Sequence, residues 1–267
     1  MQAKFSRRPL RIPWLLIYSI GVVVYLFFPL FVIALFSFNS SPSVSFPIRG
    51  LSLKWYGEVF ANPIFVSSLK NSLIVATLTT LICLSTGVSA ALMITRYQFR
   101  LKSAVRGLFL LPLSLPGLFV GISLLSYFVS LHIKLTLGTV IIGHLIYTLP
   151  YFFLVASTRL ERFDHLLEEA AQDLGCTPWE TFRKVNFPII APSIIGAATI
   201  VFALSFDEFL ITFFVIGTQN TLPMMVWSMM RRSIDPRVNA ISVILILTSI
   251  LLLYLVSKVV NISEIEI

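Results

Sequence analysis

Two adjacent carboxylates, Asp207 and Glu208, are the only acidic residues within one of the long apolar runs of this 267-residue chain. A carboxylate near the centre of a bilayer costs at least about 2.5 kcal/mol on insertion scales, so such residues usually face a bundle interior or an aqueous cavity. In a low-dielectric passage they attract cations. We therefore predict that Asp207, Glu208 and the nearby Ser205 line a path for a cationic solute. Adjacent helical residues point about 100° apart, so one of the two carboxylates faces that path.

The alternative for the acidic pair is structural. Asp207 and Glu208 can also lie near the outer end of their span, where water, a helix terminus or another subunit satisfies them.

Other polar residues do not predict catalysis or a metal site. His144 and Asn71 are isolated, and we expect interhelical hydrogen bonds from both. Cys83 and Cys176 have no histidine or acidic residue at ligand spacing. The chain also lacks H-E-x-x-H, G-x-S-x-G and the phosphate-binding G-x-x-x-x-G-K-[ST] motif. We expect no enzyme activity, no metal and no cofactor in this chain.

The composition predicts an all-α polytopic membrane protein. The chain is 57% hydrophobic and 12% charged, too apolar to cover itself in water as a soluble domain does. Several runs reach the roughly 20 residues that cross a bilayer as a helix. We predict one transmembrane domain over residues 1–267 with six helices, at 13–38, 71–95, 107–133, 135–158, 189–217 and 238–257.

The distribution of basic residues predicts that both termini are cytoplasmic. Six spans place the termini on one side, and most of the 20 Lys and Arg residues fall on that side. This asymmetry accounts for the net charge of +8 without nucleic-acid binding, because no basic run is interleaved with aromatic residues. Basic residues from Lys4 to Arg11 precede the first run, which is too long for a signal peptide and lacks a cleavage site, so we expect a retained anchor.

Prolines and glycines predict where spans bend and pack. Pro112, Pro116 and Pro150 should bend or interrupt their helices. Gly117 and Gly121 form a small-x-x-x-small pattern, which favours close helix packing.

The two longer outer connections contain aromatic and sulfur-rich segments. We expect Trp55, Tyr56 and Phe60 to form an aromatic belt at the membrane interface. In the connection 218–237, a short amphipathic helix should begin near Pro223.

The connection 159–187 predicts two short helices with a sharp bend between them. Asp164 can cap the first helix, and Gly175 stands where a left-handed terminal residue is wanted. Thr177-Pro178-Trp179-Glu180 then has the form of a capping box that starts the second helix at once. Periodicity alone also fits a segment lying on the membrane surface.

The same connection carries a family signature. Glu169-Ala170-Ala171, then Gly175, then Val185-Asn186-Phe187-Pro188 resembles the EAA signature of ABC-importer permeases, in which Ile-x-Leu-Pro is the last part. Val185 and Phe187 are mild, apolar departures. Further passages are similar to permeases of the spermidine/putrescine type, at 36–39, 54–56, 71–73, 203–208 and 239–240.

The resemblance implies a type I ABC importer permease fold in the bacterial inner membrane, with residues 159–187 as a coupling loop. The loop residues expected to dock on an ATPase are Glu169, Ala170, Ala171, Asp173, Leu174, Gly175 and Pro188. ATP and Mg²⁺ would then bind a dimer of separate ATP-binding subunits. The other expected partners are a second permease, an extracytoplasmic solute-binding protein and membrane lipid.

The expected solute is a polyamine, spermidine or putrescine, or a related cation. Similar permeases carry amino-acid derivatives, opines, iron or phosphonates, and these alternatives stay open. A stand-alone secondary transporter is the alternative of a different class, although the chain lacks visible repeated halves.

Overall fold

The computed structural model describes residues 14–42, 45–232 and 235–259. The elements in these ranges are helices, apart from an isolated antiparallel bridge between Asn39 and Leu51. The chain groups into two compact units, residues 1–59 with 234–244 and residues 60–233 with 245–267. The all-α fold predicted from composition is confirmed, whereas the single domain over 1–267 stays a prediction.

The first unit contains α1 (Trp14–Ser37), most of α2 (Lys54–Ala61) and the start of α12 (Pro236–Val259). The α1 helix is uncharged, and an 18-residue stretch of it has a mean hydropathy of 2.6, as expected of a span in lipid. Basic residues 4–11, assigned above to an anchor, lie outside the described residues.

The expected aromatic belt is wrong for Trp55. Its indole is 6% exposed, and its Nε1–H donates to the Asn39 carbonyl at 2.7 Å. Tyr56 is also held by the protein, because its hydroxyl forms a hydrogen bond of 2.8 Å with the Ser37 hydroxyl. A buried indole N–H needs an acceptor, and the chain after α1 supplies one. Trp55 therefore holds this connection to α2.

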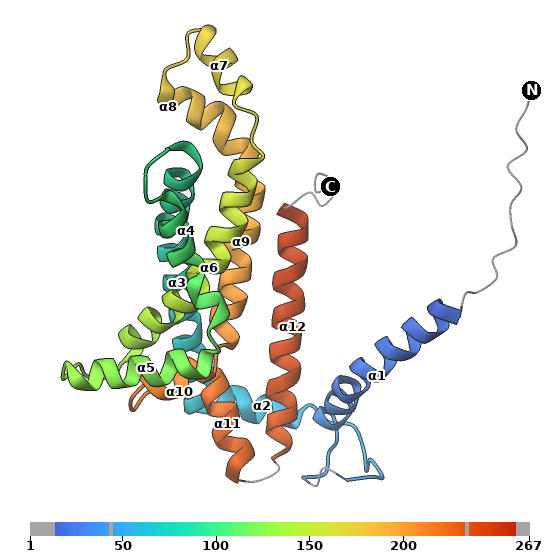
Figure 1. Ribbon diagram of the computed structural model, residues 1–267. Helices are drawn as coiled ribbons and strands as arrows, with labels where there is room; N and C mark the ends of the chain where they lie inside the picture. The colour runs from blue at the N-terminus through green and yellow to red at the C-terminus, as the bar shows by residue number, and fades with distance from the viewer. Residues whose placement is uncertain (1–13, 43–44, 233–234, 260–267) are drawn as a thin grey trace, which may run out of the picture. The chain divides into compact units, whose positions relative to one another are not determined.

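Three long helices, α3 (Pro63–Arg96), α6 (Leu137–Glu161) and α9 (Phe187–Asp207), pack side by side at the centre of the second unit (Figure 1). Small residues allow close approach. A Cβ on Gly87 would lie 2.3 Å from the Phe152 ring. The fully buried members of this core include Cys83, Ala91, Ile94, Phe152, Phe153, Ala156 and Val201.

The α3 helix begins eight residues earlier than the span predicted at 71–95. Asn62 caps it, accepting from the Ile64 N–H at 2.9 Å, and Pro63 occupies the first turn. The prediction was wrong at this end because it stopped at a charged residue, Lys70, and a lysine near a helix end can extend its ammonium group to water.

Two predicted spans are broken. The span predicted at 107–133 consists of α4 (Lys102–Leu110), η1 (Leu111–Ser114) and α5 (Gly117–Ser130), with a bend of 105° between η1 and α5. Pro112 and Pro116 lie at this bend, as expected of residues that cannot continue a helix. Pro150 does not interrupt α6.

The span predicted at 189–217 ends early. The α9 helix stops at Asp207, and α10 (Leu210–Val215) follows after two non-helical residues. After it, α11 (Leu222–Arg232) is the short helix expected near Pro223. The six predicted segments thus correspond to α1, α3, the bent α4–α5 pair, α6, α9 with α10, and α12.

The connection from α6 to α9 has the predicted bend. The first helix is α7 (Leu166–Asp173), and Gly175 adopts the left-handed φ of +90°. The second begins with α8 (Pro178–Thr181) and runs through a π-helical turn, η2 (Phe182–Asn186), directly into α9. Figure 1 shows α7 and α8 beyond the ends of α6 and α9.

Candidate functional site

The break between α9 and α10 places the two acidic residues in different environments. Asp207 is the last residue of α9 and is exposed. Within the part of the chain that the structure describes, no hydrogen bond or ion pair joins its side chain. The Glu208 side chain is 7% exposed. The helical turn thus leaves Asp207 open and turns Glu208 inward.

Glu208 caps the N-terminus of α10. The Ile211 N–H donates to both carboxylate oxygens at 3.0 and 2.9 Å, and the Thr212 N–H donates to Oε2 at 3.1 Å. These amides would have no partner inside a helix that starts at Leu210. The buried carboxylate is therefore satisfied by a helix terminus, which is the structural alternative that the sequence left open for this residue.

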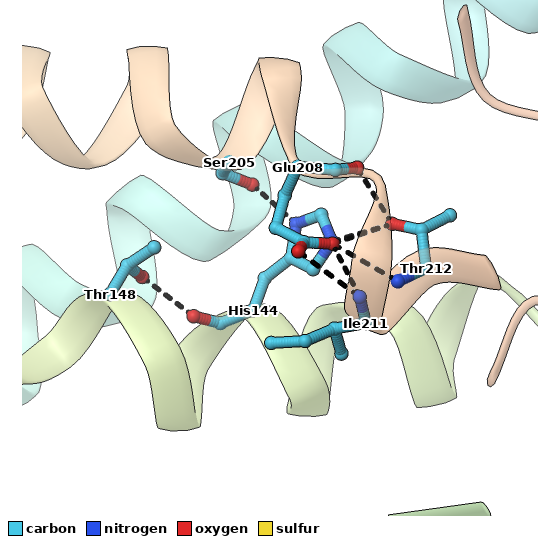
Figure 2. A network of polar contacts seen from close by, with 6 residues as sticks. All are labelled: His144, Thr148, Ser205, Glu208, Ile211 and Thr212. Atoms are coloured by element: carbon cyan, nitrogen blue, oxygen red, sulfur yellow. Dashed lines mark hydrogen bonds and ion pairs between the residues drawn. The ribbon is translucent and has the colours of Figure 1, made fainter. Parts of the chain in front are cut away.

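His144 of α6 joins both halves of the broken span (Figure 2). Its Nδ1 lies 2.7 Å from the Ser205 hydroxyl of α9, and its Nε2 lies 2.8 Å from the Thr212 hydroxyl of α10. Nε2 is also 3.7 Å from Glu208 Oε2. His144 is 1% exposed. The interhelical hydrogen bond predicted for this histidine is confirmed, and it has two partners.

The second break meets the first at Gly117 and Gly121 of α5. A Cβ on Gly117 would lie 3.7 Å from Glu208 Oε1. A Cβ on Gly121 would lie 2.8 Å from the Phe214 ring and 3.2 Å from the Ile211 Cα, so α5 packs against the backbone of α10 only because a glycine is there. The small-x-x-x-small pattern thus marks a helix contact, as predicted.

Of the three residues predicted to line a path, the structure leaves one with an exposed polar group. Ser205 is 3% exposed and is engaged with His144, and Glu208 is engaged with α10. Asp207 remains available to a solute. The prediction that the three residues line a path stays a prediction, and the geometry favours Asp207 within it.

Aromatic side chains follow the break. The Phe209 ring lies 5.8 Å from that of Phe213 and 5.2 Å from that of Trp227 in α11. A groove of about 420 Å³ lies next to them, lined by Phe213, Asn220, Met224, Trp227, Ser228 and Arg231. The Asn71 amide donates to the Asn220 carbonyl at 2.8 Å. Asn71 thus has a structural hydrogen bond, although its partner lies in the connection between α10 and α11 and not in a helix as expected.

Most of the residues of the α6–α9 loop that are expected to dock form an open surface. Ala171 is half-buried, and the exposed residues are Glu169, Ala170, Asp173, Leu174, Gly175 and Pro188. Leu174 is 87% exposed and Trp179 is 70% exposed, although both are large and apolar. Such side chains on a tight turn are typical of a protein-binding surface. The role of the signature residues in docking stays a prediction.

Local hydrogen bonds hold this surface in shape. Asp164 Oδ1 accepts from the Leu166 N–H at 3.0 Å, as predicted for the start of α7. The capping box is present, with the Thr177 N–H donating to Glu180 at 3.0 Å. This backbone bond and the Lys184 ammonium hold the pKa of Glu180 at about 2. The box therefore keeps its charge at neutral pH.

Sequence reasoning missed one residue of the loop, Glu168. Its Oε1 forms an ion pair with Arg96 at the end of α3 and accepts from the Asn186 amide at 2.8 Å. Arg96 is 72 residues away in the chain, so no local pattern could indicate this pair.

Metal ligation has no candidate among the described residues, which contain no group of three or more His, Cys, Asp or Glu side chains at metal-binding distances. The buried His144 is surrounded by hydroxyl groups and one carboxylate that α10 already occupies.

Comparison with known proteins identifies relatives over most of the chain. A family model described as "Binding-protein-dependent transport system inner membrane component" matches residues 84–264. The putrescine transport system permease protein PotI of Escherichia coli K12 is 32% identical over 88% of this chain and 86% of its own length. The spermidine/putrescine transport system permease protein PotC of Haemophilus influenzae is 29% identical over 88% of this chain and 91% of its own.

Solved structures share the fold at low sequence identity. A chain of a bacterial ABC transporter involved in the import of the acidic polysaccharide alginate superposes with a TM-score of 0.70 at 14% identity, over 96% of both chains. The MetNI methionine ABC transporter gives a TM-score of 0.62 at 18% identity, over 74% of this chain and 95% of its own.

Proposed function

This chain belongs to the family of inner membrane components of binding-protein-dependent transport systems, and we propose that the solute carried by its transport system is a polyamine. The observation that carries the proposal is the 32% identity to a putrescine permease over 88% of the chain. The exposed carboxylate of Asp207, next to an apolar helix, is the kind of group that attracts an alkylammonium ion.

Asp207 is the residue we assign to the solute path. An ammonium group that leaves water for a low-dielectric passage needs a countercharge nearby. Glu208 has a different task, because its oxygens are already occupied by the N–H groups of α10. It fixes the start of α10.

The α6–α9 loop is the surface we assign to the energy-supplying subunits. ATP and Mg²⁺ would bind a separate pair of ATPase subunits, and the exposed face around Glu169, Leu174 and Gly175 would dock on one of them. A second permease and an extracytoplasmic solute-binding protein complete the complex. The surplus of Lys and Arg on the side of the termini favours an orientation with this loop and both termini in the cytoplasm.

Transport then requires two conformations with different affinities for ATP. A ligand shifts an equilibrium only by its differential affinity for the two states. Binding of ATP to the partner subunits would favour an outward-open state through the loop, and hydrolysis would restore the inward-open state. This chain would contribute part of the solute path and the loop through which the ATPase subunits act on it.

The test is ATPase stimulation of the complete complex, reconstituted in lipid with its partner subunits and solute-binding protein. Putrescine, spermidine, an amino-acid derivative, ferric iron and a phosphonate are compared at equal concentration. Stimulation by putrescine or spermidine alone is expected. Stimulation by an anion, with none by either polyamine, would remove the polyamine assignment and would return Asp207 to a structural role.

A further inference from the structure

Glu168 occupies the place where three elements meet. It belongs to α7, and its Oε1 receives the Arg96 guanidinium from the end of α3 and the Asn186 amide from the end of η2. Its side chain is 16% exposed and that of Arg96 is 31% exposed, so the pair is shielded more than an ordinary surface pair. Charge-assisted bonds of this kind are stronger than neutral ones.

The neighbouring Glu169 is in a different situation. It is exposed. Two consecutive glutamates on one short helix therefore have different roles. Glu169 is available to a partner, and Glu168 holds α7 to its own protein.

The element bound by Asn186 is itself unusual. The η2 turn is π-helical, and the Phe187 N–H bonds to the Phe182 carbonyl five residues back. Such turns are rare and are frequent at functional sites. Two buried polar atoms of this segment, Thr181 Oγ1 and Asn186 Oδ1, have no hydrogen-bond partner among the described residues. Buried polar atoms usually have partners, so the side chains of this turn have hydrogen-bonding capacity that the present packing does not use.

We propose that Glu168 is a positioning residue that transmits movement of the α6–α9 loop to two spans at once. It drives α3 through Arg96 and α9 through Asn186. A push on α7 cannot then be absorbed by bending at Gly175, because α7 is fixed to α3. The π-helical turn is the place where α9 adjusts. This inference rests on the proposed function only in that an ATPase acts on the loop, and it does not depend on which solute is carried.

The experiment uses the complete reconstituted complex with Glu168→Gln, which keeps an acceptor for Asn186 but removes the charge that binds Arg96. The first measurement is solute uptake per ATP hydrolysed. The second is the distance between spin labels at Leu166→Cys in α7 and Tyr97→Cys after α3, in a Cys176→Ser background, with and without ATP. Both labelled positions are exposed.

A matched control is available on the same end of the unit. Glu161 of α6 pairs with Arg106 of α4 at 2.7 Å, and both side chains are about 40% exposed. Glu161→Gln should therefore leave both measurements unchanged. The double variant Arg96→Glu with Glu168→Arg restores the ion pair with reversed charges and tests whether the pair itself is required. An arginine at position 168 cannot accept from the Asn186 amide, but the unpaired Asn186 Oδ1 can accept from it once the amide turns over.

The expected result is a loss of about fivefold or more in uptake per ATP for Glu168→Gln, the lower end of typical coupling between sites. In the unsubstituted chain, the distance between the two labels should be the same with and without ATP. In Glu168→Gln, the distribution of this distance should broaden. The charge-reversed double variant should recover both the uptake per ATP and the narrow distance distribution. Unchanged uptake per ATP and label distance in Glu168→Gln would overturn the inference. A label distance that changes with ATP in the unsubstituted chain would also overturn it. If the label distances behave as expected but no polyamine is taken up, the result counts against the proposed solute alone.

Discussion

The break between α9 and α10 and the loop between α6 and α9 differ in how their polar residues are placed. At the break, Glu208, His144 and Thr212 are buried, and their side chains bond to one another or to free backbone amides. In the loop, most of the residues expected to dock are exposed, and one carboxylate, Glu168, bonds α7 to α3 and to η2.

This difference predicts whether a substitution should affect stability or coupling. A buried polar group that loses its partner costs about 1–3 kcal/mol, because no water replaces the lost bond. A surface substitution usually changes stability by less than about 0.5 kcal/mol. Changes at the break should therefore lower stability, and changes in the loop should lower coupling while the protein stays folded.

The largest effect is expected for Glu208→Ala. It removes the acceptor of the Ile211 and Thr212 amides together, so we expect a loss of about 3 kcal/mol in the free energy of unfolding. Thermal unfolding in detergent measures it. Asp207→Ala is the control, since this exposed side chain has no bond to lose. Equal loss in the two variants would mean that the two carboxylates do not differ as described.

A smaller loss is expected for Gly121→Ala. The new Cβ would lie 2.8 Å from the Phe214 ring and 3.2 Å from the Ile211 Cα, and overpacking of this kind costs about 1–3 kcal/mol. Gly107→Ala is the matched control on α4, where a Cβ meets nothing within 4 Å. The same unfolding assay compares them. If Gly121→Ala were as stable as Gly107→Ala, α5 and α10 would not pack at this glycine.

The helices were predictable because most spans contain a long run of apolar residues, and the bend at Gly175 was predictable because capping residues flank it. The start of α3 at Pro63 was missed, since Lys70 interrupts the apolar run without ending the helix. The end of α9 was missed because the charged residues there, unlike Lys70, do coincide with the end of a helix. Nothing in the local pattern distinguishes a polar pair inside a span from a polar pair at a break.

Within the site, the sequence indicated Asp207 and Glu208 but could not separate them. Their roles depend on which residue precedes a helix start, and that start depends on packing against α5 and α6. Glu168 was missed because Arg96 lies 72 residues earlier. Local patterns report caps and periodicity, whereas long-range pairs depend on the assembled bundle.

Asp207→Asn should slow transport without changing the stability of the protein. The amide removes the charge that would attract an ammonium group, so we expect about tenfold slower polyamine uptake, equivalent to about 1.4 kcal/mol in the barrier. The unfolding free energy should stay within about 0.5 kcal/mol of the unsubstituted chain, because the side chain is exposed. Uptake of a radiolabelled polyamine into vesicles measures the rate. An unchanged rate at equal insertion would remove Asp207 from the path.

The smallest effect is expected at Gly175, where the backbone rather than a contact sets the requirement. Its φ of +90° costs a residue with a Cβ about 1 kcal/mol, although a Cβ there meets nothing within 4 Å. Gly175→Ala should therefore shift the bend and lower uptake per ATP by a few fold, with little change in thermal unfolding. Gly175→Asn should come closer to the unsubstituted chain, because asparagine tolerates left-handed backbone better. If alanine and asparagine gave the same uptake per ATP, the conformation of the bend would not matter for coupling, and the exposed side chains around it would have to account for the docking alone.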